Sequence, residues 1–312
     1  GLVPTVAVVK NSTGVVQTLT VGSDANGTYV SGNLSGLADG SYTVEVTATD
    51  IAGNATKVTS DPFVIDATKP TLTLAALTGG LSSDGKFTST EATNYSQEFT
   101  ATDKAGGTGL KSTVAVVKSG TTTVQTLTVT NDLTDGGHVS GNLSGLADGT
   151  YTVEVTSTDF AGNPEVKTQT LVIDKTAPTL TLTGLTDTKL TSAEAAAYTQ
   201  NFTTSDVTSG VASTVAVVKS ASQVVQSTVL TTSGGQVKGD LSGLTDGTYT
   251  IEVTTTDYAG NVTTVISDPL VIDKTAPTLS VAGLNDTQLS SSEVGTFKQY
   301  FIAADNTGGT GL

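Results

Sequence analysis

The sequence predicts an all-β protein in which tandem antiparallel β-sandwich domains form an elongated rod. Three observations support this prediction: one segment recurs along the chain, its residues alternate between apolar and polar, and Gly, Asp and Asn separate the alternating stretches. Recurrence at a long period indicates a repeat architecture, and alternation indicates strands. The recurring segment reads LSGLxDGxYTxEVTxTDxAGN and spans residues 34–54, 143–163 and 241–261.

Each copy begins with a turn and continues as a strand with one buried face. In the first copy the apolar residues Tyr42, Val44 and Val46 alternate with polar ones, which is typical of a half-buried strand. The Asp-Gly pair before the strand is typical of a tight turn. Asp-Gly-x-Tyr also resembles the tyrosine corner of immunoglobulin-like sandwiches, in which the hydroxyl bonds to nearby backbone. That role is expected for Tyr42, Tyr151 and Tyr249.

The whole unit is clearest between Pro178 and Ile272. An extended stretch, 179–185, opens it, and the capping box Thr191-x-x-Glu194 predicts a short helical turn. Alternating stretches separated by turn signals then follow, so that about seven short strands are expected in an antiparallel two-sheet sandwich. The capping box recurs at Thr88–Glu91 and Ser290–Glu293.

The spacing of the repeats sets the number of domains. The stretch TVAVVK begins at Thr5, Thr113 and Thr214, so the period is 108 and then 101 residues, the size of one sandwich domain. Two whole domains are predicted, flanked by one partial domain with only the later strands and another with only the opening strands. The predicted bounds are 1–68, 69–175, 176–274 and 275–312.

The two partial domains together have the length of about one repeat. One interpretation is that the sequence is a window of a longer chain whose neighbouring portions are absent. The other interpretation is that the tail of one molecule completes the head of the next, as in donor-strand addition. Head-to-tail self-association therefore stays open at this point.

Composition argues against several classes of function. The chain has 29 acidic and 14 basic residues and a net charge of −15, which argues against nucleic-acid binding and suits cation binding. Cysteine is absent, so neither a disulfide framework nor thiol chemistry is expected. No apolar run approaches the roughly 18 residues of a membrane-spanning helix, so no membrane insertion is expected.

No catalytic residues are expected. His138 is the single histidine, and the surrounding DGGHVSG predicts an exposed loop. One histidine without cysteine provides neither a nucleophile–base pair nor the usual ligands of a zinc site. The glycine-rich stretch 106–109 is not followed by the Lys-Ser/Thr of a phosphate loop. A sugar-binding face has little basis, because aromatic residues make up only 5% of the chain.

Acidic residues recur at each predicted domain junction. An immunoglobulin-like geometry places the strand that leaves one domain near two loops of the next, which brings linker and loop carboxylates together. Such oxygens are typical calcium ligands, although Asp and Asn are also ordinary turn residues. The candidate ligands are Asp66, Asp103, Asp159 and Asn163 at the first junction, Asp174, Asp206, Asp257 and Asn261 at the second, and Asp273 and Asp305 at the third. Asp39, Asp148 and Asp246 lie in turns of the preceding domains and could join them.

The recurring motif, followed by IDxTAP, resembles the bacterial Ig-like repeats of giant type I-secreted (RTX and biofilm-type) surface adhesins. The resemblance covers the whole chain. It implies a stiff extender that holds a distal binding domain away from the cell, with calcium limiting bending at the junctions. The junction aspartates of the family carry over to Asp66, Asp174 and Asp273, and to the TDxAGN residues Asp159, Asn163, Asp257 and Asn261. The first linker, DATKP, departs from the DKTAP pattern, so the first junction is expected to differ.

The expected function is therefore that of a non-enzymatic, extracellular spacer in an adhesin at the bacterial cell surface, acting in adhesion or biofilm formation. Its expected partners are neighbouring repeats of the same chain, with the receptor outside this segment. The alternative is a subunit of a self-assembling extracellular filament or surface layer. In that alternative, the C-terminal strands of one molecule complete the N-terminal partial domain of the next.

Overall fold

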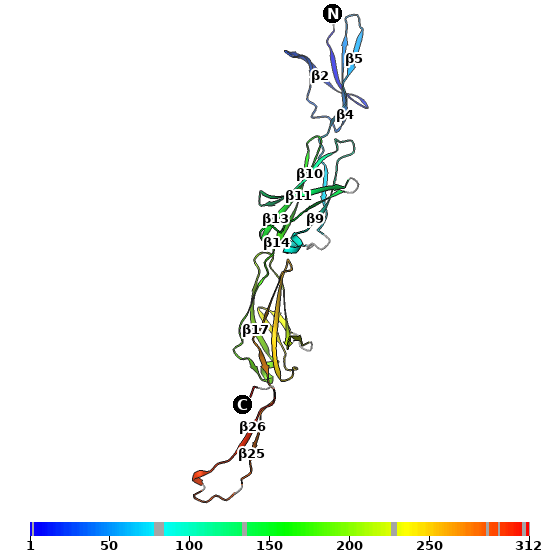
Figure 1. The fold of residues 1–312 in the computed structure, drawn as a ribbon. Helices are drawn as coiled ribbons and strands as arrows, with labels where there is room; N and C mark the ends of the chain where they lie inside the picture. The colour runs from blue at the N-terminus through cyan, green and yellow to red at the C-terminus, as the bar shows by residue number, and fades with distance from the viewer. Residues whose placement is uncertain are drawn as a thin grey trace. The chain divides into compact units, whose positions relative to one another are not determined.

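The computed structural model describes residues 1, 3–77, 84–132, 136–225, 230–284, 287–292, 294–307, 310 and 311. The chain forms two compact units, Gly1–Ile173 and Asp174–Leu312. Figure 1 shows that strands dominate both units, and the helices among the described residues are short. The prediction of an all-β fold is confirmed.

The first unit begins with a six-stranded sheet in the order β3-β2-β1-β4-β5, with β6 paired to β4. A small hydrophobic core around Val9, Leu19 and Tyr42 lies on its apolar face. The alternation in the recurring segment puts Tyr42 on this face, as the sequence predicts. The strands are β1 (Val6–Asn11), β2 (Gly14–Asp24), β3 (Gly27–Ser31), β4 (Gly40–Thr49), β5 (Ala55–Thr59) and β6 (Phe63–Ile65).

The rest of the first unit is an eight-stranded path, β7-β9-β12-β11-β10-β13-β14-β8. This path folds back on itself, because β14 also contacts β7 near the opposite end. The two layers enclose a second core that contains Phe87, Tyr95 and Leu143. The elements are β7 (Thr71–Leu74), β8 (Lys86–Phe87), α1 (Ser89–Ala92), β9 (Tyr95–Thr102), β10 (Leu110–Ser119), β11 (Thr122–Asp132), β12 (Gly136–Gly141), β13 (Gly149–Asp159) and β14 (Pro164–Ile173).

The second unit repeats this arrangement with two sheets, β15-β17-β21-β20 and β16-β24-β22-β18-β19, and β23 paired to β22. Leu241, Ile251 and Ile272 are fully buried in its core. A separate hairpin of β25 and β26 follows. The elements are β15 (Thr179–Leu182), β16 (Lys189–Leu190), α2 (Ser192–Ala196), β17 (Tyr198–Ser205), β18 (Val211–Ser220), β19 (Gln223–Val224), β20 (Leu230–Ser233), β21 (Gln236–Gly239), β22 (Gly247–Asp257), β23 (Val262–Ile266), β24 (Leu270–Ile272), β25 (Thr278–Val281), η1 (Val294–Thr296) and β26 (Phe301–Ala304).

The local motifs form as the sequence predicts. Each predicted tyrosine corner is made: Tyr42, Tyr151 and Tyr249 donate from their hydroxyls to the carbonyl four residues earlier, at 2.7, 2.9 and 2.9 Å. Complete capping boxes start α1 at Thr88 and α2 at Thr191. The third predicted box, Ser290–Glu293, includes a residue outside the described ranges.

His138 corrects the prediction of a loop. It lies in β12, opposite Glu98 of β9 and Thr130 of β11, with its side chain exposed. The glycines around it suggest a turn, but β12 is a middle strand whose backbone is bonded on both sides. Long-range pairing therefore outweighs the weak local preference of glycine.

The strand that follows each recurring segment takes two forms. In the complete sandwich of the first unit, β14 pairs with β13 in one unbroken register. In the second unit the corresponding strand is divided into β23 and β24, and the register shifts by one residue between them. Ser267 fills this bulge: its hydroxyl accepts a 2.9 Å bond from the Ile251 amide, in place of a backbone carbonyl. Ser60 does the same for Val44.

Candidate metal centres

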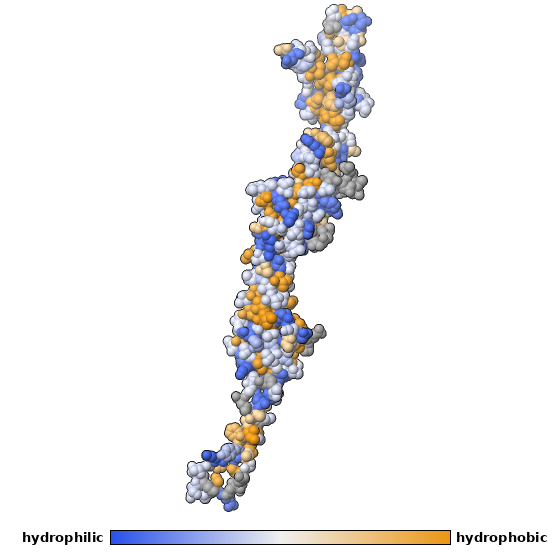
Figure 2. Space-filling view, viewed as in Figure 1, coloured by the Kyte–Doolittle hydropathy of each residue, from blue (hydrophilic) through white to orange (hydrophobic). Residues whose placement is uncertain are grey.

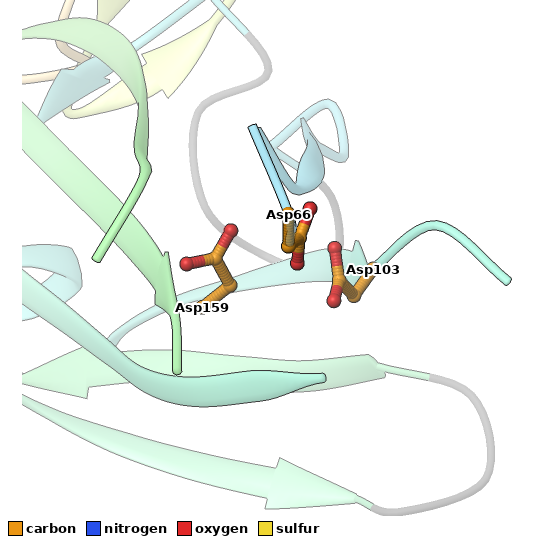
Figure 3. Close-up of side chains that lie close together, drawn as sticks. All are labelled: Asp66, Asp103 and Asp159. Atoms are coloured by element: carbon orange, nitrogen blue, oxygen red, sulfur yellow. The ribbon is translucent and has the colours of Figure 1, made fainter. Parts of the chain in front are cut away.

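Three aspartates converge at the first linker. Asp66 directly follows β6, Asp103 follows β9, and Asp159 ends β13. One carboxylate oxygen from each lies within 4.8 Å of the others. Figure 3 shows the three side chains pointing toward one another from separate segments. The structure thus brings together the three predicted carboxylates of this junction, which lie far apart in the sequence.

The loop after β9 wraps around two of these carboxylates. Thr108 donates to Asp66 Oδ2 from both its amide and its hydroxyl, at 2.7 and 2.8 Å. The Gly109 amide donates to Asp103 Oδ2 at 2.6 Å. A side chain at Gly107 would collide, because its Cβ would lie 2.8 Å from Asp103 Oδ2 and 3.0 Å from Asp66 Oδ2. Gly107 therefore lets the backbone approach the acidic cluster closely.

Asn163 orients the third carboxylate. Its amide groups hold both oxygens of the buried Asp159, with the backbone N and Nδ2 each 2.8 Å away. Nδ2 also donates to the Asp66 carbonyl at 3.1 Å. Burial alone would raise the pKa of Asp159, but these hydrogen bonds outweigh it and the pKa lies below its usual range. Asn163 therefore acts as a brace, and its function as a ligand stays a prediction.

A second triad lies at the start of the second unit. Asp174 precedes β15, Asp206 follows β17 and Asp257 ends β22. Their carboxylate oxygens again lie within 4.8 Å of one another. Asp206 Oδ1 accepts from the amides of Ser209 and Gly210 at 2.8 and 2.7 Å. Two clusters built alike from different parts of the chain support a shared design.

Asp174 is a buried carboxylate with two other carboxylates close to it. It is fully buried, and Asp257 is only 2% exposed. Burial raises the pKa of Asp174, and the charges of Asp206 and Asp257 raise it further. The folded cluster therefore concentrates negative charge that its hydrogen bonds do not fully offset. A divalent cation would relieve that charge.

Asn261 braces the second triad as Asn163 braces the first. Its Nδ2 donates to Asp257 Oδ2 and to the Asp174 carbonyl, each at 2.9 Å. Both asparagines thus connect a linker carbonyl to the last carboxylate of a recurring segment. Their shared geometry makes each linker part of the domain that follows it.

The third predicted junction shows the corresponding part of the pattern. Thr310 donates to Asp273 Oδ2 from its amide and hydroxyl, at 2.7 and 3.0 Å. The Gly311 amide donates to Asp305 Oδ2 at 2.7 Å. These contacts repeat those of Asp66 and Asp103. Two of the three carboxylates in each triad therefore have counterparts here, in Asp273 and Asp305.

Asp50 and Asn54 belong to the same pattern, although they are not among the candidate residues predicted from the sequence. Asn54 donates to the two oxygens of Asp50 from its backbone N and Nδ2, both at 2.8 Å. This matches the pair Asp159 and Asn163. The signal was present in the TDIAGN of the first recurring segment, so alignment of the three copies would have found it.

The donor chemistry fits calcium. Carboxylate and carbonyl oxygens are hard ligands, and calcium tolerates irregular geometry. Among the described residues, the clusters of three or more potential ligands contain only aspartates, whereas zinc prefers nitrogen and sulfur. In the same described part of the chain, no helix is long and apolar enough to cross a membrane.

Profiles of two families match the chain. The bacterial Ig-like domain profile matches residues 3–67. The profile of group 3 of the bacterial Ig-like domains matches residues 135–238 and 234–303, which together span more than half of the chain. None of the curated protein sequences matches at a significant level.

Solved structures of bacterial adhesins are similar to the chain at low TM-scores. A tetra-tandem repeat from the extending region of a large adhesion protein is 28% identical, with 89% of this chain and 69% of that chain covered and a TM-score of 0.35. A Ca²⁺-stabilised adhesin of an Antarctic bacterium is 24% identical, with 90% and 68% covered and a TM-score of 0.35. A 1.5-MDa bacterial ice-binding adhesin is 20% identical, with 88% of each chain covered and a TM-score of 0.37.

Proposed function

This chain belongs to the bacterial Ig-like domain family, and from that premise we propose that it is a spacer segment of an extracellular adhesin at the bacterial surface, used in adhesion or biofilm formation. Tandem repetition supports this, because the three copies build three separate hydrophobic cores. The proposed domains are 1–68, 69–175, 176–274 and 275–312. The proposed function is mechanical and not enzymatic: each domain adds length and the receptor lies elsewhere.

Calcium at the junctions is the proposed stiffening device. The observation that carries it is Asp174, a fully buried linker carboxylate with Asp206 and Asp257 within 4.8 Å. A bound calcium ion would satisfy three carboxylates that otherwise repel one another. Asp66, Asp103 and Asp159 would form the same kind of site at the first linker.

Calcium binding would limit bending because of where the ligands come from. In each triad one carboxylate belongs to the linker; of the other two, one follows a strand of the next domain and one is the last residue of another of its strands. An ion held by all three ties the linker to that domain, and the free energy of binding then opposes local opening of the joint. Asp273 and Asp305 would contribute to a third site of the same design.

The test is calcium titration of the whole chain, followed by calorimetry and by small-angle scattering. We expect saturable binding, a higher melting temperature and a longer, stiffer particle. Asp174→Asn should remove one binding event, whereas Asp61→Asn, at an exposed position between β5 and β6, should leave binding unchanged. Absence of binding at millimolar calcium would refute the calcium proposal and leave the spacer proposal standing.

A second candidate function, head-to-tail assembly, is favoured by the exposed apolar side chains of the β25–β26 hairpin. Leu279 and Phe301 are 67% and 66% exposed. The corresponding Leu72 and Phe99 of the complete sandwich are 2% and 3% exposed. Figure 2 shows apolar surface both on this hairpin and on the sheet of β1–β6. A second copy could cover the hairpin with that sheet.

Sedimentation velocity over a hundredfold range of protein concentration tests this second candidate. Growth of the particle with concentration, abolished by Phe301→Glu, would support assembly. Val207→Glu is the matched control, because Val207 is 99% exposed and lies outside the hairpin. A chain that stays monomeric throughout would exclude assembly and leave the spacer function in place.

A further inference from the structure

A carboxylate outside the triad joins three segments at the first linker. Asp39 lies in the turn before β4, with its side chain only 10% exposed. Its Oδ1 accepts from the Ala67 amide at 2.9 Å, and its Oδ2 accepts from the Thr68 hydroxyl. The ammonium of Lys104, in the loop after β9, lies 3.1 Å from the same Oδ2. One side chain, which belongs to a turn of its own domain, therefore contacts both the linker and the next domain.

Asp246 makes the same three-way connection in the second unit. It lies in the turn before β22. Its Oδ1 accepts from the Lys274 amide at 3.0 Å, and its Oδ2 accepts from the Thr275 hydroxyl at 2.7 Å. The third partner is Asn306 Nδ2, 3.0 Å away in the loop after β26. Asn306 directly follows Asp305, as Lys104 directly follows Asp103.

We propose that Asp39 and Asp246 are latch residues, each of which fixes the orientation of its own domain relative to the following one through contacts that need no metal. A covalent linker alone is a pivot and leaves bending and twisting free. The latch adds an attachment point between the turn of one domain and a loop of the next. Hydrogen bonds to a charged acceptor are about twice as strong as neutral ones, so one carboxylate suffices.

The two latches make the same connection with different residues. In the first, the linker reads DATKP, and the positive charge comes from Lys104 of the next domain. In the second, the linker reads DKTAP, and Lys274 places its charge near Asp246 while Asn306 supplies the hydrogen bond. The departure of the first linker from the common pattern is therefore matched by a change in the loop that faces it.

The latch is chemically distinct from the acidic triads. The contacts of Asp39 and Asp246 are N–H and O–H donors, which serve both carboxylate oxygens. The pKa of Asp39 is accordingly lowered to about 2 by the Thr68 hydroxyl, the Ala67 amide and Lys104. Neither Asp39 nor Asp246 belongs to the clusters of three carboxylates found among the described residues. Their contacts with the linker and with the next domain therefore form without an ion.

The test measures, in calcium-free buffer, how freely the two domains on either side of the first linker (the first joint) move relative to each other. The chain contains no cysteine, so Ser35→Cys and Thr100→Cys introduce a unique pair of nitroxide labels at exposed positions on either side of the first joint. Double electron–electron resonance then gives the distribution of distances between the labels. EGTA removes any contribution of calcium to the joint.

We expect a narrow distribution for the parent protein, and at least a twofold broader one for Asp39→Ala and for Lys104→Ala. Asp61→Ala, at an exposed position of the same domain, should leave the width unchanged. Lys104→Ala serves as the second variant in case Asp39→Ala misfolds. The Lys104 side chain is 51% exposed, and its loss removes the contact with Asp39. An unchanged width in Lys104→Ala would overturn the proposal, whatever Asp39→Ala does.

Discussion

The side-chain amide of Asn163 donates a hydrogen bond to the backbone carbonyl of Asp66, across 97 positions of sequence. The same bond joins Asn261 to Asp174. In both cases the asparagine that closes a recurring segment holds the linker that enters its own domain. The linker is therefore bonded to the following domain before any ion binds, and the carboxylates are positioned in advance.

Replacing Asn163 with Ala should lower the stability of the first unit by about 1.5–3 kcal/mol, because bonds to a buried carboxylate are lost. Asn54→Ala is the internal control. Asn54 bonds to the more exposed Asp50, so the loss there should be smaller. Scanning calorimetry of both variants measures the difference. Equal shifts in melting temperature would show that the linker contact and burial add nothing.

Asp174→Asn should stabilise the calcium-free chain. Burial raises the pKa of Asp174, so the folded state holds its proton more tightly than the unfolded state does. Stability should then fall as pH rises from the ordinary Asp value through the folded pKa, and the asparagine removes this loss. In calcium the order should reverse, since ion binding at about 100 times Kd adds about 2.7 kcal/mol only where the site is intact.

Melting curves of the parent and of Asp174→Asn, recorded from pH 3 to 8 with EGTA or with calcium, measure both effects. Asp206→Asn offers a comparison at a less buried member of the same triad. A variant that is less stable than the parent in EGTA at pH 8 would contradict the assigned sign.

The latch at Asp39 should depend on pH in the opposite sense. Its pKa is lowered from 3.8 to about 2, so its stabilising contribution is fully present above about pH 4 and disappears as pH falls to about 2. The difference in melting temperature between the parent and Asp39→Asn should shrink over this interval. A difference that stays constant from pH 5 to 2 would mean that the carboxylate charge has no part in the latch.

Ser267→Ala should destabilise the pairing of β22 with the bulged strand that contains Ser267. The substitution leaves the buried Ile251 amide without the hydroxyl that accepts its hydrogen bond, at a cost of about 1–3 kcal/mol. Hydrogen exchange of the Ile251 amide should accelerate at least tenfold. Ser60→Ala is the matched variant. The bond from the Val44 amide to Ser60 is exposed, so this amide should respond less because water replaces the hydroxyl. Similar acceleration at both amides would rule out burial as the cause.

Local motifs could be predicted from the sequence because their partners are close in the chain. The Tyr151 hydroxyl reaches a carbonyl four residues away, and the Thr88 and Glu91 box spans one helical turn. Alternation places Val153 and Val155 on the buried face of β13. Threefold recurrence made these short-range signals specific, and it indicated which aspartates to expect at each junction.

Tertiary structure decided what those signals leave open. Sequence spacing marked Asn163 as a ligand candidate, whereas its brace geometry depends on where a linker 97 positions away passes. His138 lies in a strand because two neighbouring strands bond to β12. The contact of Lys104 with Asp39 joins residues 65 positions apart. Local patterns fix which face a side chain occupies, but its partner is set by packing between segments, which no short stretch of sequence contains.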